Sequence, residues 1–468
     1  MSTAQRIADL VRCSLARGEQ AWLVGGAVRD AQMGRPSDDL DFVVHGDAGR
    51  LARVMADRAG GAVFRYSERF STHRVVHAAG HADFAPLRGE SLAADLAARD
   101  FTVNALAQDV GTGELIDPLG GRADLQARRL RLCAPDALVA DPVRIMRLVR
   151  LRHALEFEPE PRAVEAARAA AEGLTSVSGE RLERELSALL GLPVPASAVR
   201  DLDGLGALVH VVPELAALKG VSQNPYHHLD VFEHTLEALE HLPGVVAQLG
   251  GERYLVDPQQ LGLAAAGALV PLAYAVLLHD LGKPSIKKVD EEGRILFWHH
   301  DEVGAAMAVA VARRLKMSRR MEVFLALLVR QHLRLGFLVR EAPLTPRALA
   351  RYRRDVEPYV FESVALSLAD RMATRGPSTP AVAIARHFRL AREIWTEVAK
   401  QPAALPLDGE QVMALLGLEP GPRVGAALDA LREEVEAGEV AGAAEARAYL
   451  LLWSHRRRAE PTCEGDGS

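Results

Sequence analysis

Two short stretches, Leu23-Val24-Gly25-Gly26-Ala27-Val28-Arg29-Asp30 and Asp39-Leu40-Asp41-Phe42-Val43-Val44, decide how this chain of 468 residues folds at its N-terminal end. The first is typical of a strand that ends in a glycine turn and continues as a helix. The second predicts a β-strand, and because side chains alternate along a strand, Asp39 and Asp41 point to the same face. Two carboxylates side by side repel each other, so this pair predicts a cation between them.

The glycine turn and the two aspartates together predict a nucleotide site. A divalent cation held by the pair carries a triphosphate in this interpretation, and the backbone N–H groups of Gly25 and Gly26 with the guanidinium of Arg29 receive the phosphates. Asp83 lies in a later strand-like run and is a candidate third carboxylate. The alternative for Asp83 is an ordinary charge at a strand edge.

These residues resemble the nucleotidyltransferase signature of the DNA-polymerase-β superfamily, in the form carried by class II tRNA nucleotidyltransferases (CCA-adding enzymes) and bacterial poly(A) polymerases. Later motifs extend the resemblance: Arg99-Asp100-Phe101-Thr102-Val103-Asn104-Ala105-Leu106, Asp117-Pro118-Leu119-Gly120-Gly121 with Asp124-Leu125, and Asp141-Pro142-Val143-Arg144-Ile145-Met146-Arg147-Leu148-Val149-Arg150. The resemblance implies template-independent addition of CCA to a tRNA 3′ end from CTP and ATP. It also implies that Asp39 and Asp41 are catalytic and hold Mg²⁺, with Gly26 and Arg29 binding the nucleotide.

The last of these motifs repeats charged residues. Asp141, Arg144, Arg147 and Arg150 recur every three residues, so on a helix they drift slowly around one face. Stacked arginines repel one another unless an anion is present, which favours a nucleotide-binding groove over an ordinary solvated helix. By resemblance, Asp141 and Arg144 select CTP and ATP over UTP and GTP. Arg99 is placed by resemblance on the triphosphate or the sugar, and its alternative is a salt bridge at a helix start.

The connection between Asp83 and Arg99 is short for a CCA-adding enzyme, in which a flexible loop usually lies at this place. A short connection makes a poor lever for re-forming the pocket between C and A addition, so a CC-adding enzyme is the first alternative. A poly(A) polymerase is the second, although the stretch Phe64-Arg65-Tyr66-Ser67-Glu68-Arg69-Phe70-Ser71-Thr72 lacks the arginine-rich character that such enzymes carry after the aspartate strand.

Histidines and aspartates farther along the chain predict a second metal site. They resemble the HD phosphohydrolase superfamily, which implies that His234, His279, Asp280 and Asp370 are metal ligands. His300 and His332 then complete a second metal site or bind phosphate. Imidazole and carboxylate together favour a divalent transition metal such as Ni²⁺, Co²⁺ or Mn²⁺. The implied activities are phosphatase, 2′-nucleotidase and 2′,3′-cyclic phosphodiesterase, and a third alternative is an HD phosphohydrolase whose N-terminal domain only binds RNA.

The pattern of strand and helix signals predicts an α/β N-terminal domain of the polymerase-β type, followed by an all-α part that contains the HD domain. The expected divisions are a catalytic head at 1–125, a nucleotide-recognition and RNA-binding neck at 126–200, an HD metal-dependent phosphohydrolase domain at 201–395, a helical tRNA-binding tail at 400–455, and a disordered end at 456–468.

The charge distribution, the cysteines and the apolar stretches bear on the partners and the compartment of the protein. The formal net charge is −6, yet residues 311–354 hold twelve Lys or Arg against two Glu, which makes them a candidate phosphate-contacting segment. The three cysteines lie far apart and predict no disulfide framework, which favours a reducing cytoplasm. The chain begins without a signal pattern, and its longest apolar stretch, 261–278, is typical of a buried core helix rather than a membrane span. We expect a monomer or homodimer without membrane partners.

Overall fold

The computed structural model describes residues 3–67, 71–77, 80–263, 266–340, 344–398 and 404–459, and it divides into two compact units, Met1–Val211 and Val212–Ser468. The first unit includes the predicted head and neck together with residues 201–211 of the predicted metal domain, and the second includes the rest of that domain and the tail. The finer divisions stay predictions. The segment Glu68–Phe70, which bears on the poly(A) polymerase alternative, lies outside the described residues.

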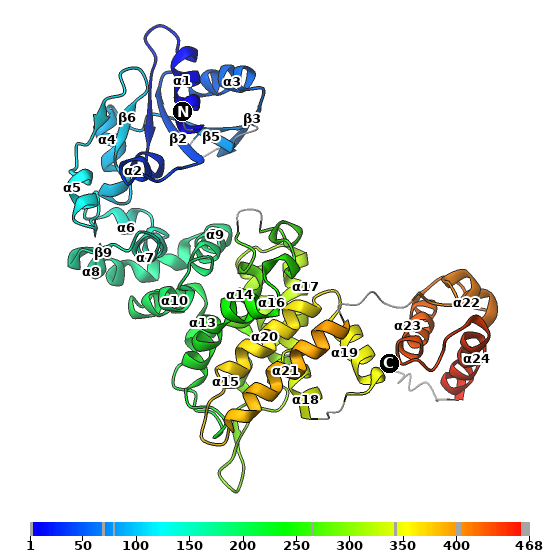
Figure 1. The fold of residues 1–468 in the computed structure, drawn as a ribbon. Helices are drawn as coiled ribbons and strands as arrows, with labels where there is room; N and C mark the ends of the chain where they lie inside the picture. Colours follow the sequence, from blue (N-terminus) through cyan, green and yellow to red (C-terminus); the bar gives the residue numbers. More distant parts are fainter. Residues whose placement is uncertain are drawn as a thin grey trace, which may run out of the picture. The chain divides into compact units, whose positions relative to one another are not determined.

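In the described part of the first unit, a seven-stranded mixed sheet forms the centre (Figure 1), in the order β3-β4-β5-β2-β1-β6-β7. The central pair β2 and β5 is parallel, and the other pairs are antiparallel. The strands are β1 (Gln20–Val24), β2 (Asp39–His45), β3 (Ala62–Ser67), β4 (Thr72–His77), β5 (Gly80–Pro86), β6 (Ala107–Asp109) and β7 (Leu115–Ile116).

The alternation of side chains along β2 gives the sheet two different faces. Leu40, Phe42 and Val44 are buried under α1 (Thr3–Ser14) and α3 (Ala48–Ala59), where the ring of Phe42 stacks on Phe84 with centroids 5.1 Å apart. Val43 packs on the opposite face with Leu96 of α4 (Leu92–Ala97). Because Asp39 and Asp41 alternate with the first set, they belong to the α4 face.

Further helices and short helical turns complete the first unit. They are α2 (Gly26–Gln32), η1 (Thr102–Asn104), α5 (Gly121–Gln126), α6 (Ala137–Ala140), α7 (Arg144–Leu155), α8 (Pro161–Ala170), η2 (Ala171–Ser176), α9 (Gly179–Leu190), α10 (Pro195–Gly204) and α11 (Leu208–Val211). The two short strands β8 (Arg129–Leu130) and β9 (Glu158–Pro159) pair in parallel and tie the start of this helical part together.

The second unit is helical apart from a hairpin of β10 (Lys288–Val289) and β11 (Ile295–Leu296). Its elements are α12 (Pro213–Ala216), α13 (Val231–Leu249), η3 (Glu252–Tyr254), η4 (Pro258–Leu261), α14 (Val270–Leu278), α15 (Lys283–Ile286), α16 (His300–Arg314), α17 (Arg319–Gln331), α18 (Arg334–Arg340), α19 (Pro346–Val356), α20 (Val360–Met372) and α21 (Ala381–Val398). In the apolar stretch 261–278, helix α14 begins at Val270, and every residue of this helix is buried. The predicted α/β part followed by a helical remainder is confirmed.

The C-terminal helices are α22 (Gly409–Leu416), α23 (Pro422–Glu436) and α24 (Ala443–Ala459), which share a core of buried Leu, Val and Ala. Helix α24 runs to Ala459, four residues past the predicted end of the tail at 455, because its arginine-rich last turn continues the helix instead of breaking it. Residues 460–468 lie outside the described residues. Within the described ranges, no helix is both long and apolar enough to cross a bilayer.

Candidate nucleotidyl-transfer and metal sites

Asp39 and Asp41 lie at the start of β2, on the α4 face of the sheet. Asp39 is 70% exposed, and His81 of the neighbouring strand β5 lies with its Nε2 3.0 Å from the Asp39 Oδ1. Asp41 lies deeper, and burial together with the charge of Asp39 raises its pKa to about 6. A half-buried carboxylate with a raised pKa beside a second carboxylate is a site where a divalent cation lowers the electrostatic free energy.

The turn at Gly25 brings the second motif close to these carboxylates. Gly25 has φ +76°, and a Cβ at this position would lie 3.2 Å from the Arg99 Nη1 and 3.9 Å from the Asp41 Oδ2. Its N–H, however, donates to the carbonyl oxygen of Leu106 at 3.1 Å. The prediction that the Gly25 N–H receives phosphate is therefore wrong for this conformation, because strand pairing with the second motif uses that donor.

Asp83 faces Asp41 across the parallel pair β2–β5 and is buried. Both of its carboxylate oxygens accept from Arg74 of β4, each at 2.7 Å. This bidentate ion pair neutralises the carboxylate. Asp83 therefore lies beside the aspartate pair, as expected of a third carboxylate, but in this conformation it is bound to an arginine. Neither alternative, a third metal carboxylate or an ordinary strand-edge charge, describes it fully.

A chain of hydrogen bonds joins Arg29 to the neck helix. The Arg29 Nη1 donates to the Asn104 Oδ1 at 2.6 Å, and the Asn104 Nδ2 donates to the buried carboxylate of Asp100 at 3.1 Å. The Arg147 Nη2 lies 3.2 Å from the other Asp100 oxygen. Burial raises the pKa of Asp100, but the charge of Arg147 and the hydrogen bonds from the Phe101 N–H and Asn104 together hold it below its usual value. The first, second and last motifs therefore form one connected network.

Arg99 is held by a residue that the sequence motifs did not single out. Asp95 of α4 is buried, and its Oδ2 accepts from the Arg99 Nη2 at 3.2 Å. The Asp95 Oδ1 accepts from the backbone N–H of Arg88 at 3.2 Å. The helical spacing of four residues between Asp95 and Arg99 was the signal that could have identified this pair.

The charged row of α7 is neutralised from within the protein. Arg150 donates to Glu185 at 2.8 Å, and Arg147 lies between Glu185 and Asp100. The argument that these arginines need an external anion is therefore wrong, because α9 supplies Glu185, a residue that the local sequence pattern could not reveal.

The two predicted base-reading residues are also occupied. Arg144 donates to the backbone carbonyl oxygens of Ala98, Arg99 and Ala137, at 2.8 to 3.3 Å. The Asp141 Oδ2 accepts from Arg181 at 2.7 Å and lies 3.8 Å from the Arg144 Nε. Recognition of a base edge by this pair requires some of these contacts to exchange.

The second unit brings together every predicted residue of the histidine and aspartate set. His234 comes from α13, His300 is the first residue of α16, His332 follows α17, and Asp370 lies in the last turns of α20. Helix α14 ends at Leu278, so His279 and Asp280 lie in the turn after it rather than on successive faces of a helix. Their ligand atoms form two groups that each fit within 4.8 Å: His234, His279 and Asp370, and Asp280, His300 and His332.

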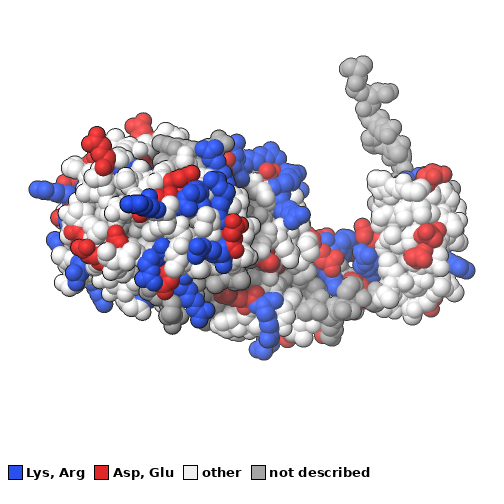
Figure 2. All heavy atoms as spheres, turned by 90° about the horizontal axis from the view of Figure 1, so that it is seen from above, with Lys and Arg blue, Asp and Glu red and all other residues white. Residues whose placement is uncertain are grey.

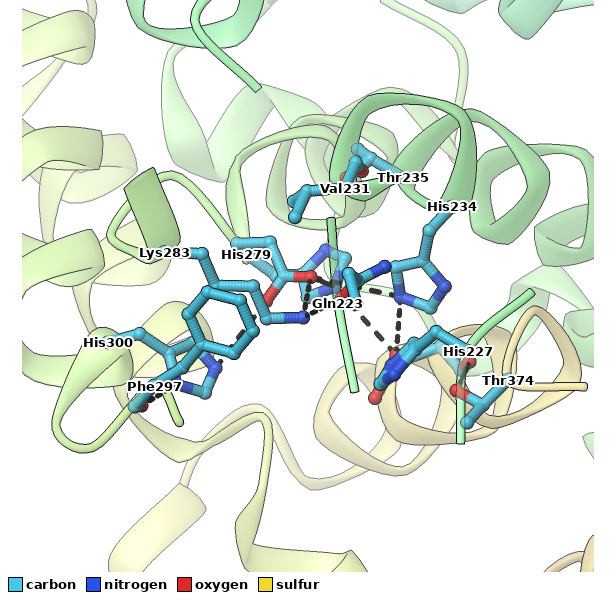
Figure 3. A network of polar contacts seen from close by, with 12 residues as sticks. Gln223, His227, Val231, His234, Thr235, His279, Lys283, Phe297, His300 and Thr374 are labelled. Carbon is cyan, nitrogen blue, oxygen red and sulfur yellow. Dashed lines mark hydrogen bonds and ion pairs between the residues drawn. The ribbon is translucent and has the colours of Figure 1, made fainter. Parts of the chain in front are cut away.

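All the imidazoles of the cluster are oriented in the same way. The Nδ1 atoms of His279, His300 and His332 lie 2.6 to 2.7 Å from the carbonyl oxygens three residues before each of them, and the His234 Nδ1 lies 3.3 Å from the Ala373 oxygen. A carbonyl oxygen only accepts, so each Nδ1 carries a proton and each Nε2 of a neutral ring presents a lone pair. Figure 3 shows the rings of His234, His279 and His300 turned toward a common centre.

Asp280 lies between the two groups. Its Oδ1 is 3.4 Å from the His300 Nε2 and 3.9 Å from the His332 Nε2, whereas its Oδ2 is 3.2 Å from the His279 Nε2 and 3.8 Å from the His234 Nε2. Among the described residues, the buried Asp280 Oδ1 and His279 Nε2 have no hydrogen-bond partner. Orphaned buried acceptors of this kind fit a divalent cation on each side of Asp280.

The electrostatics of the cluster keep its donors ready for a metal. Burial lowers the pKa of His332 to about 3, and it also lowers the pKa of His300, so both rings are neutral at pH 7. Although burial opposes it, the charge of His279 and Lys283 lowers the pKa of Asp280, and His234 lowers that of Asp370. Neutral imidazoles and ionised carboxylates are the forms that coordinate metals. The charges of Asp280 and Asp370 raise the pKa of His279 although burial opposes it, so a metal takes the place of a proton on that ring.

A cavity of about 720 Å³ opens onto the cluster, and it contains residues that were not predicted. Lys283 is buried, and its Nζ donates to the Asp280 Oδ2 at 2.6 Å and to the Gln223 Oε1 at 2.7 Å. The ring of Phe297 lies over the same ammonium at 5.4 Å (Figure 3). His227 lines the cavity next to His234, and burial lowers its pKa to about 3.

The basic segment 311–354 is less available to phosphates than its composition indicates. Eight of its arginines lie within ion-pair distance of carboxylates: Arg313, Arg314, Arg319, Arg334, Arg347, Arg351, Arg353 and Arg354. In particular, Arg351 and Arg354 of α19 both donate to Glu433 of α23 at 2.7 Å. Figure 2 accordingly shows blue and red side chains interspersed on the face it presents.

Comparisons with known proteins place this geometry in a family. The model described as the poly A polymerase head domain matches residues 21–92 and 87–131, and the model described as the probable RNA and SrmB-binding site of polymerase A matches 156–219. An A-adding tRNA nucleotidyltransferase of Deinococcus radiodurans is 38% identical over 93% of this chain and 95% of its own length.

A second relative and a solved structure point to the same family. A CC-adding tRNA nucleotidyltransferase of Thermus thermophilus is 36% identical over 94% of this chain and 95% of its own length. The fold is similar to that of the Thermotoga maritima CCA-adding enzyme complexed with tRNA, with a TM-score of 0.59, 20% identity, and coverage of 96% of this chain and 94% of that one. The resemblance inferred from the motifs is confirmed, and the chain belongs to the tRNA nucleotidyltransferase family.

Proposed function

We propose that this protein extends the 3′ end of tRNA with nucleotides of the CCA sequence, taking them from CTP and ATP without a nucleic-acid template. The observation that carries the proposal is the placement of Asp39 and Asp41 on one strand face, with Arg99 held beside them by Asp95. The names of the relatives support the substrate. Because the three widely spaced cysteines favour a reducing compartment, we place the reaction in the cytoplasm.

In the proposed reaction, the tRNA 3′-oxygen attacks the α-phosphorus, its proton leaves, and pyrophosphate departs. Asp39 and Asp41 would hold Mg²⁺, which supplies charge neutralisation at the phosphoryl group and acidifies the attacking hydroxyl. Arg29 and Arg99 bind the triphosphate, and Gly26 lies in the turn that approaches it. Arg147 and Arg150 hold α7 against the carboxylates of Asp100 and Glu185, and Asp141 and Arg144 present the base-reading edge.

A second candidate is an enzyme that adds only part of CCA, either the two C residues or the final A. The connection between β5 and α4, residues 87–91, supports it. The Leu87 N–H donates to the Val44 oxygen at 2.9 Å, the Arg88 N–H donates to Asp95, and Ser91 caps α4 by accepting from the Ala94 N–H. A segment anchored at both ends makes a poor lever for switching between nucleotides. Relatives of both partial types match over nearly the full chain.

One experiment separates these candidates. Three tRNA transcripts that end before the first C, after the first C and after the second C are each incubated with CTP, with ATP or with both. Complete synthesis on the shortest transcript identifies a CCA-adding enzyme, and a stop after two C residues identifies a CC-adding enzyme. Extension of only the longest transcript, by one A, identifies an A-adding enzyme. Runs of A on a non-tRNA oligonucleotide would support the poly(A) polymerase alternative and contradict our proposal.

We further propose that the second unit holds a two-metal phosphoesterase site. His234, His279 and Asp370 would hold one divalent transition metal ion, His300 and His332 a second, and Asp280 would bridge them. Such ions supply polarisation of the phosphoester and acidify the attacking water. Lys283 would neutralise charge on the phosphoryl oxygens. The convergent Nε2 atoms and the orphaned Asp280 Oδ1 support this proposal. If the first unit only bound RNA, the paired carboxylates of Asp39 and Asp41 would have no role there.

A further inference from the structure

Aromatic side chains lie at the metal-cluster cavity but take no part in the proposed chemistry. Trp298 lies between β11 and α16 and is 70% exposed, and Phe337 of α18 is 50% exposed. Both line the same 720 Å³ cavity as Asp280, His300 and His332. Two exposed aromatic side chains that line one cavity together with a few polar groups are typical of a small-molecule binding site.

Trp298 lies close in the sequence to a predicted metal ligand and lines the same cavity. Trp298 precedes His300 by two residues, which keeps their Cα atoms within about 7 Å of each other. Phe297, between β11 and Trp298, lies over the Lys283 ammonium and against the His300 ring. Trp298 therefore lies on the cavity wall beside the segment that carries His300. Phe337 comes from a different segment of the chain and lines the same cavity.

We propose that Trp298 and Phe337 form a base-binding subsite, which makes the cavity selective for phosphoesters of nucleosides over other phosphoesters. This inference rests on the proposed phosphoesterase function. A nucleobase has a flat π-face that stacks on an indole, and such stacking needs no hydrogen-bond code. Arg386 and Lys283 on the cavity wall add positive charge that suits the phosphate of the same ligand. The ligand is a ribonucleotide phosphate, with the phosphate at the cluster and the base at Trp298.

The test compares 2′-AMP with 2-glycerophosphate, an aliphatic phosphate monoester that has no ring to stack. Base–aromatic stacking of about 1–3 kcal/mol corresponds to about a 5- to 100-fold change. We therefore expect Trp298→Ala to raise KM for 2′-AMP by this factor and to leave 2-glycerophosphate hydrolysis unchanged. Trp298→Phe keeps a stacking surface and should restore most of the loss. Tyr254→Ala, which removes an exposed ring that lines a different cavity, is the matched control.

The outcomes distinguish this inference from the function on which it rests. Equal losses on both substrates show a structural role for Trp298, and no change on either shows that the base does not contact it. Both results overturn the inference. If the wild type hydrolyses neither substrate with Ni²⁺, Co²⁺, Mn²⁺ or Mg²⁺, the phosphoesterase proposal fails by itself. Calorimetric titration with 2′-AMP then decides: a binding event lost in Trp298→Ala but kept in Tyr254→Ala supports the subsite, and an unchanged titration overturns it.

Discussion

The Nε2 atoms of His300 and His332 lie 3.1 Å apart, although each ring already donates its Nδ1 proton to a backbone carbonyl oxygen. Burial favours the neutral form of both rings, so two lone pairs face each other at this distance. Such an arrangement is unfavourable unless a cation accepts both lone pairs. The backbone thus orients two imidazoles in advance for a ligand that neither could hold alone.

The double variant His279→Ala, Asp280→Ala should lose metal binding and phosphoesterase activity but keep nucleotide addition. The reason is that Asp280 contacts both groups of the cluster, while Asp39 and Asp41 lie in the other compact unit. Bound Ni²⁺, Co²⁺ or Mn²⁺ is counted by elemental analysis after dialysis. His299→Ala removes an exposed histidine next to His300 and serves as the control. Retention of full metal content by the double variant would contradict the assignment.

Asp41→Asn should lower the rate of nucleotide addition by several orders of magnitude if Asp41 holds the catalytic metal. The same substitution should stabilise the metal-free protein at pH 7. The folded-state pKa of Asp41 is raised from 3.8 to about 6, so its favourable contribution is present below pH 4 and is lost as the pH rises through 6. The charged carboxylate therefore costs up to roughly 3 kcal/mol at pH 7.

The stability gain of Asp41→Asn is measured by denaturant unfolding at pH 7 and at pH 4. It should fade at pH 4 and should shrink when Mg²⁺ is added at pH 7, because the ion relieves the repulsion in the wild type. Asp39→Asn, at the more exposed of the two positions, should show a smaller gain. If the Asp41→Asn variant and the wild type have equal unfolding free energies at pH 7 and at pH 4, the charge of Asp41 does not destabilise the folded protein.

Asp95→Asn should raise KM for the nucleotide by about tenfold with little change in kcat. The substitution keeps the shape of the side chain but removes the charge that holds the Arg99 guanidinium, which corresponds to about 1.5–3 kcal/mol for a charge-assisted hydrogen bond. The comparison is with Asp124→Asn, another buried carboxylate paired with arginines in the same unit but away from Arg99. If both variants lose only stability, Asp95 has no role in positioning Arg99.

Asp141→Ala and Arg144→Ala should differ in their effect on stability, although the sequence pattern predicts one shared role for the two residues. Both should relax discrimination against UTP and GTP. Arg144→Ala should also lower the free energy of unfolding by about 1–3 kcal/mol, because it leaves the carbonyl oxygens of Ala98, Arg99 and Ala137 without their donor. Misincorporation assays and denaturant unfolding measure the two effects. Unchanged selectivity in both variants would indicate that this helix does not read the base.

The sequence by itself determined those features that depend on neighbours along the chain. The alternation in β2 placed Asp39 and Asp41 on one face, and the glycine turn after β1 started a helix at Gly26, as the structure has them. The ordered motifs identified the family, and the histidines and aspartates of the second unit were listed before their geometry was known. Each of these follows from local backbone geometry or from residue types that occur together for a chemical reason.

The tertiary structure alone decided which partner each of these groups meets. Glu185 neutralises Arg147 and Arg150 from a helix more than thirty residues away, Arg74 binds both oxygens of Asp83, and Leu106 takes the Gly25 N–H. No local pattern reveals such contacts, because they arise when distant elements pack and each buried charge or donor must find a partner. For the same reason, the bridging position of Asp280 exists only once α13, α14, α16, α17 and α20 have packed together.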